Sequence, residues 1–506
     1  MFKGIPNDTL FVLRVRTPID SRHFFGMMLA GIILFTVLQT WPRLDANLAV
    51  DEPYTANLVH LPLSTMWAEF QQVGYEITYH LVLKAWVLLF GDGETALRSL
   101  SLLFYSLSVV TVGLVARHIG GMRVGLCAAY LMAVSSPLGI THAANARPYA
   151  LLAMQVSLAL LIYFRTVQSP SVYSLLPILL ICLHVLGLMN HPIYLFFMVG
   201  CVFTAWVIAR RVFTLMAMCS VVALIVYLLL WWPALQTSLV LPRTTWMNSP
   251  TFADLIDGIH NLWGMPGLLL LGASLTGAIL LRGKLLIALG ILLVTMIGSL
   301  FFVSQFNPIF NPERTPILFL PVASVLVALL ITRLKWHLLT SVILAVVGLN
   351  SILVLAHDLT KVDSLPTPDS VASVLDTAHC GDTFILGALS FSAVEYELRR
   401  LDAPDCIRRE SFPLSTQSHP GWMDLAGLSA HRATLQDEAR ATVERLAAQA
   451  GRTIWVFYIR TPGDYHNLAD ILKWELDRRF NRVETLELRG LYFDSILVYS
   501  NEVTKP

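Results

Sequence analysis

Eleven long apolar segments fill most of the first 357 residues and limit the folds that this chain can adopt. An α-helix of about 17 to 25 mainly apolar residues crosses the hydrocarbon core of a bilayer. Only 14% of the residues are charged, against about 25% in soluble domains. The sequence therefore predicts an α-helical, multi-pass membrane protein. The segments lie at about 24–42, 98–118, 123–141, 148–165, 172–190, 193–210, 212–232, 266–281, 284–303, 315–333 and 338–357.

The basic residues between these segments predict their orientation. With the N-terminus inside, thirteen Lys and Arg residues fall on the inner side of the membrane part and six on the outer side, as the positive-inside rule requires. The first segment is too long for a signal-peptide core and lacks a small-residue cleavage pattern, so we expect it to stay attached. We therefore expect a multi-pass membrane protein with a cytoplasmic segment at 1–23, a transmembrane domain at 24–357 and an extracytoplasmic C-terminus.

After about residue 358 the charged residues become frequent and the apolar runs become short. Helical spacing alternates with short β-rich runs, which indicates a small soluble α/β domain over 358–506. The expected helices are 370–379, 440–450 and 467–479, and the expected strands are 383–389, 453–459, 482–488 and 491–499. Cys380 and Cys406 lie in this domain, where an oxidising compartment would permit a disulfide. The sequence leaves their pairing open.

An acidic pair, Asp51-Glu52, follows the first apolar segment in the long loop 43–97. Carboxylates beside a bilayer are energetically costly and often mark chemistry. A base at this depth could act on a lipid-borne substrate with its headgroup at the same level. The alternative is that the pair caps a juxtamembrane helix starting at Pro53. Residues 61–70 and 78–90 of the loop are suited to helices lying on the membrane surface, and 78–90 could also be a buried half-helix.

Several motifs in one order give a resemblance to a known family. The acidic pair is followed by Thr-Tyr-His-Leu-Val-Leu-Lys-Ala-Trp (78–86), Phe-Gly-Asp-Gly-Glu-Thr-Ala-Leu-Arg (90–98), Asn-Ala-Arg-Pro-Tyr-Ala-Leu (145–151) and Asn-Pro-Glu-Arg (311–314). This order resembles the C-type (GT-C) integral membrane glycosyltransferases. The chain is most similar in pattern to bacterial relatives of the dolichyl-phosphate-mannose protein mannosyltransferases, including the aminoarabinose and galacturonic acid transferases acting on lipid A.

Two positions depart from that pattern. The family often has His-Pro-Pro-Leu or Lys-Pro-Pro-Leu where this chain has Tyr75-Glu76-Ile77-Thr78, and Asn145 replaces a glutamate. A histidine-based metal contact or a lysine phosphate clamp is therefore not expected at 75–78. The sugar and the acceptor are expected to differ from those of the better-known members.

The resemblance implies a GT-C fold of about eleven transmembrane helices and inverting transfer of a hexose or pentose from a polyprenyl-phosphate donor. The acceptor would be a glycan, lipid or protein hydroxyl on the outer face, in cell-envelope polysaccharide or glycolipid synthesis. Asp51 matches the general base, and a carboxylate near a low-dielectric surface is a stronger base than in water. Glu52 would orient the acceptor or a cation. The donor phosphate would be bound by Arg147, Arg314 and Lys84, because it needs outer cations, and the other substrate-binding candidates are Tyr54, Tyr75, Glu76, Tyr149 and His191.

No cofactor is specified by the sequence. Asp51 and Glu52 could share Mg²⁺ or Mn²⁺ with the donor phosphate, since hard oxygen ligands suit these ions. The net charge of +1 and the lack of a basic patch argue against nucleic acid as a partner. A lone histidine at a helix end, such as His142 or His191, is more often structural than functional. Two alternatives to a transferase remain, a flippase or transporter and a non-catalytic binder of lipid-linked sugars.

Overall fold

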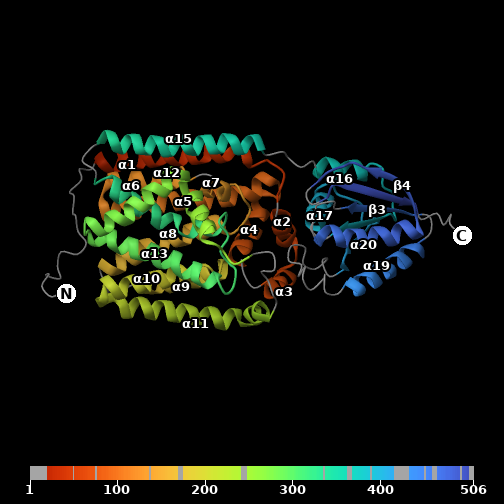
Figure 1. Cartoon of the computed structure of the whole chain (residues 1–506), viewed down its shortest axis with the longest axis horizontal. Helices are drawn as coiled ribbons and strands as arrows, with labels where there is room; N and C mark the ends of the chain where they lie inside the picture. The colour runs from red at the N-terminus through yellow and green to blue at the C-terminus, as the bar shows by residue number, and fades with distance from the viewer. Residues whose placement is uncertain are drawn as a thin grey trace. The chain divides into compact units, whose positions relative to one another are not determined.

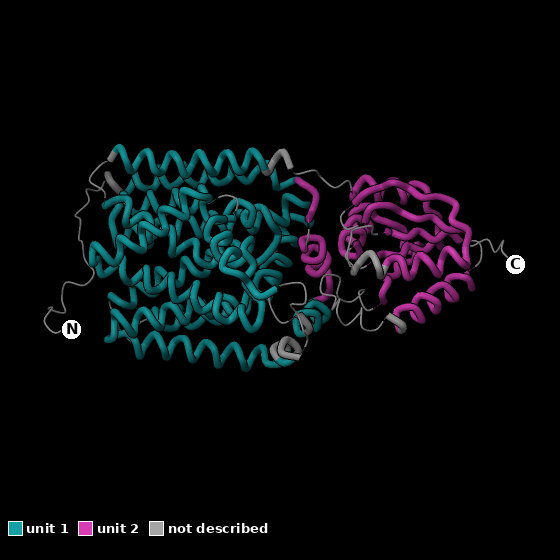
Figure 2. Tube along the Cα trace, in the orientation of Figure 1, with its two compact units in different colours: residues 1–45, 63–240, 246–362 teal, residues 46–62, 241–245, 363–506 magenta. Residues whose placement is uncertain are grey.

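The computed structural model describes residues 20–49, 51–73, 77–135, 138–168, 175–240, 248–333, 337–361, 367–387, 390–414, 432–449, 452–458, 464–490 and 493–500. These residues form two compact units, which Figure 2 shows in different colours. The first contains the described parts of 1–45, 63–240 and 246–362 and is helical. The second contains the described parts of 46–62 and 363–506 and includes a sheet.

The first unit is built from helices that Figure 1 labels along the chain. The α-helices are α1 (Asp20–Thr40), α3 (Leu63–Val73), α4 (Ile77–Phe90), α5 (Glu94–Gly120), α6 (Met122–Ala133), α7 (Leu138–Ala143), α8 (Tyr149–Gln168), α9 (Leu175–Asn190), α10 (Tyr194–Ile208), α11 (Arg210–Val240), α12 (Phe252–Leu280), α13 (Lys284–Ser304), α14 (Leu320–Ile331) and α15 (His337–Lys361). Two 3-10 turns, η2 (Trp41–Arg43) and η3 (Thr315–Leu318), join them.

Each of the eleven apolar segments overlaps at least one of these helices. Among the described residues, seven helices are long and apolar enough to cross a membrane, namely α1, α5, α8, α11, α12, α13 and α15. Four other segments form the shorter apolar helices α6, α9, α10 and α14. The chain is therefore a multi-pass membrane protein, as the sequence predicts.

Two segments differ in detail from the prediction. The expected helix 123–141 is broken, because α6 ends at Ala133 and α7 starts at Leu138. The sequence has Pro137 at this point, and proline disfavours a continuing helix. The segment 266–281 belongs to a longer helix, α12, which is interrupted at Trp263 and Gly264. Gly264 has a φ of +72°, a conformation that suits glycine.

Polar side chains join helices inside the first unit. Ser108 of α5 and Ser157 of α8 share a hydrogen bond of 2.9 Å between their hydroxyls. Tyr105 donates to the carbonyl of Met132 at 2.6 Å. Such bonds stabilise helix packing where water is absent. Helix α14 is buried on nearly every side, as expected for a helix that is apolar all round.

The second unit contains a five-stranded mixed sheet in the order β2-β1-β3-β5-β4. Strand β1 is parallel to β2 and β3, and β5 is antiparallel to β3 and β4. The prediction of a small α/β domain is confirmed. Its elements are α2 (Glu52–His60), α16 (Thr367–Leu375), β1 (Thr383–Gly387), α17 (Ser390–Arg400), β2 (Arg408–Phe412), α19 (Arg432–Ala447), β3 (Thr453–Tyr458), α20 (Asp464–Arg479), β4 (Asn481–Leu486) and β5 (Ser495–Ser500).

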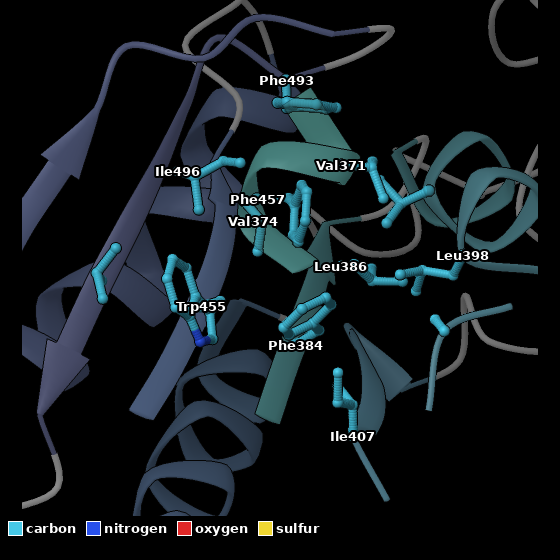
Figure 3. Packing of buried hydrophobic residues seen from close by; sticks show 13 residues of the cluster. Val371, Val374, Phe384, Leu386, Leu398, Ile407, Trp455, Phe457, Phe493 and Ile496 are labelled. Carbon is cyan, nitrogen blue, oxygen red and sulfur yellow. The ribbon is translucent and has the colours of Figure 1, made fainter. Parts of the chain in front are cut away.

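Alternating side chains of the central strands form two apolar cores. Phe384 and Leu386 of β1 lie on one face with Trp455 and Phe457 of β3, packed against α16 and α17 (Figure 3). Ile385 lies on the other face, in the core that α19 and α20 cover. This period of two is what a strand buried on both faces produces.

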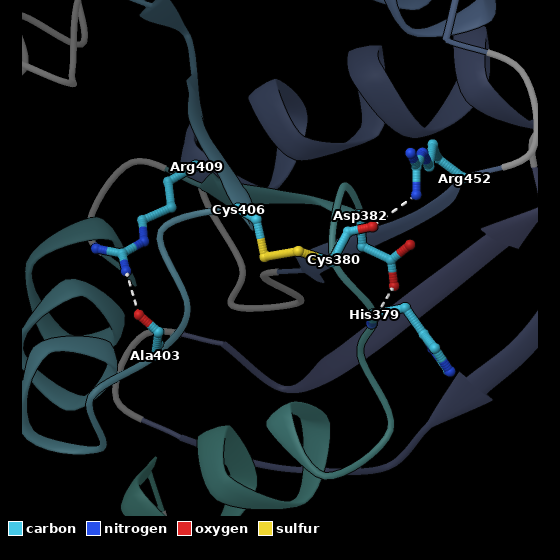
Figure 4. Close-up of a disulfide and its surroundings, with 7 residues drawn as sticks. All are labelled: His379, Cys380, Asp382, Ala403, Cys406, Arg409 and Arg452. Atoms are coloured by element: carbon cyan, nitrogen blue, oxygen red, sulfur yellow. Dashed lines mark hydrogen bonds between the residues drawn. A yellow bond between two sulfur atoms is a disulfide. The ribbon is translucent and has the colours of Figure 1, made fainter.

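The disulfide that the sequence left open is present. Cys380 and Cys406 are bonded, and their Cα atoms are 5.1 Å apart (Figure 4). The bond joins the loop before β1 to the loop before β2. Asp382, beside it, accepts hydrogen bonds from the backbone of His379 at 2.9 Å and of Thr453 at 3.0 Å. The start of the parallel strand pair is therefore fixed by both covalent and polar contacts.

Candidate functional site

The acidic pair lies at the start of α2, in the second unit. Glu52 and Pro53 occupy the first turn of the helix. A carboxylate is stabilised there by the positive end of the helix dipole. Proline is tolerated there because the first N–H groups of a helix have no partner within the helix. The helix ends at His60, because Leu61 is extended before Pro62, as residues before proline usually are. The local sequence thus places both carboxylates at one end of a short helix.

The two carboxylates have different surroundings. Glu52 is only 2% exposed, and its Oε2 accepts a hydrogen bond from the backbone N–H of Ala49 at 3.0 Å. Asp51 is half-buried and occupies the cap position of α2, but its side chain makes no capping hydrogen bond. The capping alternative for Asp51 is therefore not realised. Glu52 thus fixes the preceding loop through Ala49, and Asp51 lies half-buried beside it.

Helix α2 is attached to the domain of the C-terminal sheet. It packs against α17, and the side-chain amide of Asn57 donates a hydrogen bond to the carbonyl of Ser392 at 2.9 Å. The segment 46–62 therefore belongs to the second unit, although in the sequence it lies between segments of the first. The position of Asp51 within this unit depends on that contact.

A second set of candidate residues meets in the first unit, where α7 turns into α8. Arg147 is 4% exposed and lies in this turn, two residues before α8 begins. The carbonyl of Pro148 accepts from the backbone of Leu152 at 2.9 Å and from the side-chain amide of Asn190 at 3.2 Å. Asn190, at the end of α9, thus fixes the start of α8 and the place of Arg147.

Three rings form a row beside Arg147. The ring centroids of His142 and Tyr149 are 4.6 Å apart, and those of Tyr149 and His191 are 5.7 Å apart. His142 donates from Nε2 to the carbonyl of Glu313 at 3.2 Å. That hydrogen bond brings the loop that contains Arg314 next to the row of rings.

The positive charges of both arginines reach this row of rings. Burial lowers the pKa of His142 to about 3, helped by the positive charges of Arg314 and Arg147 and opposed by the bond to the Glu313 carbonyl. Burial also lowers the pKa of His191 to about 3, again helped by Arg147 and Arg314. Both imidazoles are therefore neutral near pH 7, so the positive charges in this cluster are those of Arg147 and Arg314. Such a cluster is suited to binding an anion.

The loop of Arg314 is held by short-range and tertiary bonds. Thr315 donates from its hydroxyl to the Asn311 carbonyl at 2.8 Å, and Asn261 of α12 donates to the Pro312 carbonyl at 3.0 Å. The backbone N–H of Glu313 donates to the side chain of Asn311 at 2.8 Å. Residues 311–315 are thus a fixed turn and not a loose connection.

The structure brings together four of the residues singled out from sequence, Arg147, Arg314, Tyr149 and His191. It places Asp51, Glu52 and Tyr54 in the second unit and Lys84 on α4 in the first. Tyr75 and Glu76 lie outside the described residues. The sequence did not indicate Asn190, because its only signal is a polar residue at the end of an apolar run.

A metal was considered for the acidic pair. In the part of the chain that the structure describes, no group of three or more His, Cys, Asp or Glu side chains lies close enough to hold an ion. Asp51 and Glu52 supply two hard oxygen ligands, and one Glu52 oxygen already accepts from Ala49. A divalent cation here would therefore need further oxygen ligands from a phosphate or from water.

No protein-family model matches the sequence, and no curated protein sequence does so either. Solved structures do match. ArnT from Cupriavidus metallidurans, bound to undecaprenyl phosphate, superimposes with a TM-score of 0.60 at 14% identity over 96% of this chain and 99% of that one. The archaeal oligosaccharyltransferase AglB from Archaeoglobus fulgidus, with an inhibitory peptide and a dolichol-phosphate, superimposes with a TM-score of 0.51 at 11% identity over 92% and 73%.

The chain has the GT-C fold. The resemblance to GT-C proteins seen in the order of its motifs is thereby confirmed for the fold. The GT-C likeness extends over almost the whole length of ArnT, so it includes the C-terminal sheet domain as well as the helices. At this level of identity it establishes the architecture, and the chemistry depends on the residues themselves.

Proposed function

We propose that this chain is an inverting membrane glycosyltransferase that moves a sugar from a polyprenyl-phosphate donor to an acceptor hydroxyl. The observation that carries the proposal is that the turn of Arg147 and the loop of Arg314 meet at the buried rings of His142, Tyr149 and His191. Fixed cations in a buried place are what a lipid-linked phosphate needs. Support comes from the two GT-C structures, which contain undecaprenyl phosphate and dolichol-phosphate.

The reaction requires a base, and Asp51 is the residue we propose for it. Its carboxylate would take the proton of the acceptor hydroxyl as the oxygen attacks the anomeric carbon. The bond from the acceptor oxygen to that carbon forms while the bond from the carbon to the phosphate oxygen breaks. The electron pair of the broken bond leaves with polyprenyl phosphate. Attack opposite the leaving group inverts the anomeric configuration.

Arg147 and Arg314 would stabilise the leaving phosphate. Negative charge on the phosphate grows as the glycosidic bond breaks, so a charge-assisted contact is stronger in the transition state than in the bound donor. Lys84 would contribute a further cation. The departing phosphate carries two negative charges when fully released, which is a reason for the site to contain two arginines rather than one.

The remaining candidates are assigned to substrate contacts. Glu52 would hold the loop and orient the acceptor, alone or through a divalent cation that Asp51 and Glu52 share with the donor phosphate. Tyr54, Tyr75, Glu76, Tyr149 and His191 would contact donor or acceptor. We place the reaction on the outer face of a bacterial inner membrane, with residues 1–23 inside and 358–506 outside as a lid or acceptor platform. The sugar is a hexose or pentose, and the acceptor is a glycan, a lipid or a protein.

The test is a transfer assay with the purified chain in liposomes. Radiolabelled polyprenyl-phosphate hexoses and pentoses are the donors, and an envelope lipid and glycan extract supplies the acceptors. We expect at least one donor to release polyprenyl phosphate as its sugar appears on an acceptor. A flippase would instead move the intact sugar lipid across the bilayer, and a binding protein would leave it unchanged; either result with every donor would overturn the proposal.

A further inference from the structure

His142 presents an acceptor atom that no protein group satisfies among the described residues. Its Nε2 is 3.2 Å from the Glu313 carbonyl, and a carbonyl only accepts, so Nε2 must carry the hydrogen. In the neutral ring Nδ1 then presents a lone pair. This Nδ1 is fully buried without a hydrogen-bond partner, in a residue that is 4% exposed.

Asn190 has the same property. Its Nδ2 donates to the Pro148 carbonyl at 3.2 Å, which fixes the orientation of the amide. The opposite atom, Oδ1, is an acceptor, and it is buried without a partner in a residue that has no exposed surface. Asn145, in the turn before α8, also has a buried Oδ1 without a partner in the described chain.

These acceptors belong to the cluster of the two arginines. His142 lies against the ring of Tyr149, whose other neighbour is His191, the residue after Asn190. The charges of Arg147 and Arg314 reach His142. Buried polar atoms in native proteins are almost always hydrogen-bonded, and those that are not often await a ligand, an ion or water.

The chemistry of the atoms limits that ligand. Lone pairs of His142 and Asn190 can only accept, so the ligand must bring O–H or N–H donors. Arginine side chains can only donate, so the two arginines beside these acceptors favour a ligand that also carries an anion. A hydroxyl-rich group joined to a phosphate meets both requirements.

We propose that His142 and Asn190 accept hydroxyl hydrogens from the sugar of the lipid-linked donor, beside the arginines that bind its phosphate. This deepens the proposed function and rests on it. His142 and Asn190 are then residues that recognise the sugar and set which sugar the chain accepts.

The test compares two lipids on the same protein. Affinity is measured for a short-chain polyprenyl phosphate and for the same lipid carrying a sugar, using the full-length chain in nanodiscs. His142→Phe keeps a ring against Tyr149 and Asn190→Leu keeps the volume. Each removes an acceptor, and each also removes the donor to Glu313 or Pro148, a loss that acts on both lipids alike. We therefore expect each to lower the affinity for the sugar lipid about three- to tenfold more than the affinity for the bare lipid, as expected for one further lost hydrogen bond. His142→Asn, which restores an acceptor near the Nδ1 position, should recover part of the loss.

His184→Phe is the matched control. His184 is a buried histidine of the same helix as Asn190, and its Nδ1 is already 3.1 Å from the hydroxyl of Tyr194. Its loss should leave the ratio of the two affinities unchanged. Equal weakening of both lipids by His142→Phe and Asn190→Leu, or no weakening of either, would overturn the sugar contact and indicate a structural or water-filled site. Failure of the unaltered chain to bind either lipid would instead overturn the proposed function.

Discussion

Arg147 and Arg314 are far apart in the sequence, yet they act on the same two imidazoles. Three hydrogen bonds produce this meeting. Asn190 fixes the start of α8, His142 holds the Glu313 carbonyl, and Asn261 holds that of Pro312. Side chains fixed by packing and by neighbouring bonds lose little freedom when they bind, which favours a specific ligand.

Replacement of either arginine should both weaken donor binding and slow the transfer reaction. Arg147→Ala or Arg314→Ala is expected to raise the donor KM and lower kcat, each by about tenfold or more, because the contact strengthens as phosphate departs. Lys at either position should rescue only partly, since it lacks the planar fork. Steady-state kinetics in liposomes measure both constants. Arg165 is an exposed arginine of α8, and Arg165→Ala is the control. Unchanged KM and kcat in a variant with alanine at both 147 and 314 would show that the two arginines do not bind the phosphate.

The neutral His142 should make stability depend on pH. Its folded pKa is lowered to about 3, while an unfolded histidine titrates near 6.5. As pH falls below about 6.5 the unfolded chain binds a proton that the folded chain does not, so stability falls progressively toward pH 3. Thermal unfolding in detergent at pH 7.5 and pH 5 measures this. His142→Phe should reduce the difference between the two pH values, and an unaltered difference would show that His142 does not cause it.

At the scale of helices and strands, apolar length predicted most of the fold. The eleven segments are recovered because a buried helix in a membrane must be apolar along its whole length. Helix α17 and strand β2 were missed. Strand β2 reads Arg-Arg-Glu-Ser-Phe and lies at the edge of the sheet. Charged residues on an edge strand prevent it from pairing with another chain. The same residues replace the apolar alternation by which a strand is recognised in a sequence. Helix α17 is short and polar on one face, so neither its length nor its composition distinguished it.

The candidate site was predicted in part, for a similar reason. The arginines were found because a lipid phosphate requires cations near the ends of spans. The acceptor atoms of His142 and Asn190 were not found. Each is left as an acceptor because the other polar atom of its side chain donates a hydrogen bond to a residue far away in the sequence. No local pattern encodes such bonds. The attachment of α2 to α17 was equally hidden, since it joins residues 57 and 392.

That attachment leads to a prediction for Asn57. Its amide is a tether between the helix that carries Asp51 and the Ser392 carbonyl. Asn57→Ala should leave donor affinity unchanged and lower kcat about tenfold, because a small displacement of a catalytic group slows the chemical step. Kinetics with saturating donor separate the two effects. A kcat within twofold of the original for Asn57→Ala would show that the tether does not position Asp51.

At the scale of the whole molecule, the fold of a membrane helix unit with an attached sheet domain is that of GT-C proteins. The orientation in the membrane is our proposal. It rests on an odd number of crossings and on basic residues that favour an inside N-terminus. The disulfide between Cys380 and Cys406 agrees with an oxidising compartment for the second unit.

Orientation can be tested through those cysteines. Cys182 is the exposed free cysteine among those described, so Cys182→Ser provides a clean background. After mild reduction of intact spheroplasts, a membrane-impermeant thiol reagent should label Cys380 or Cys406, located by peptide mass mapping. Labelling only after the membrane is permeabilised would place the second unit, and Asp51 with it, in the cytoplasm.

The most direct test of the account is the transfer rate of Asp51→Asn in the liposome assay. The change is nearly isosteric and removes only the base, so we predict that donor binding and folding persist while transfer falls at least about a hundredfold, the usual scale for a lost general base. Asp45→Asn makes the same exchange at an exposed residue of the preceding segment and should retain transfer. Turnover of Asp51→Asn within a few fold of the unaltered chain would contradict the assignment of Asp51 as the catalytic base.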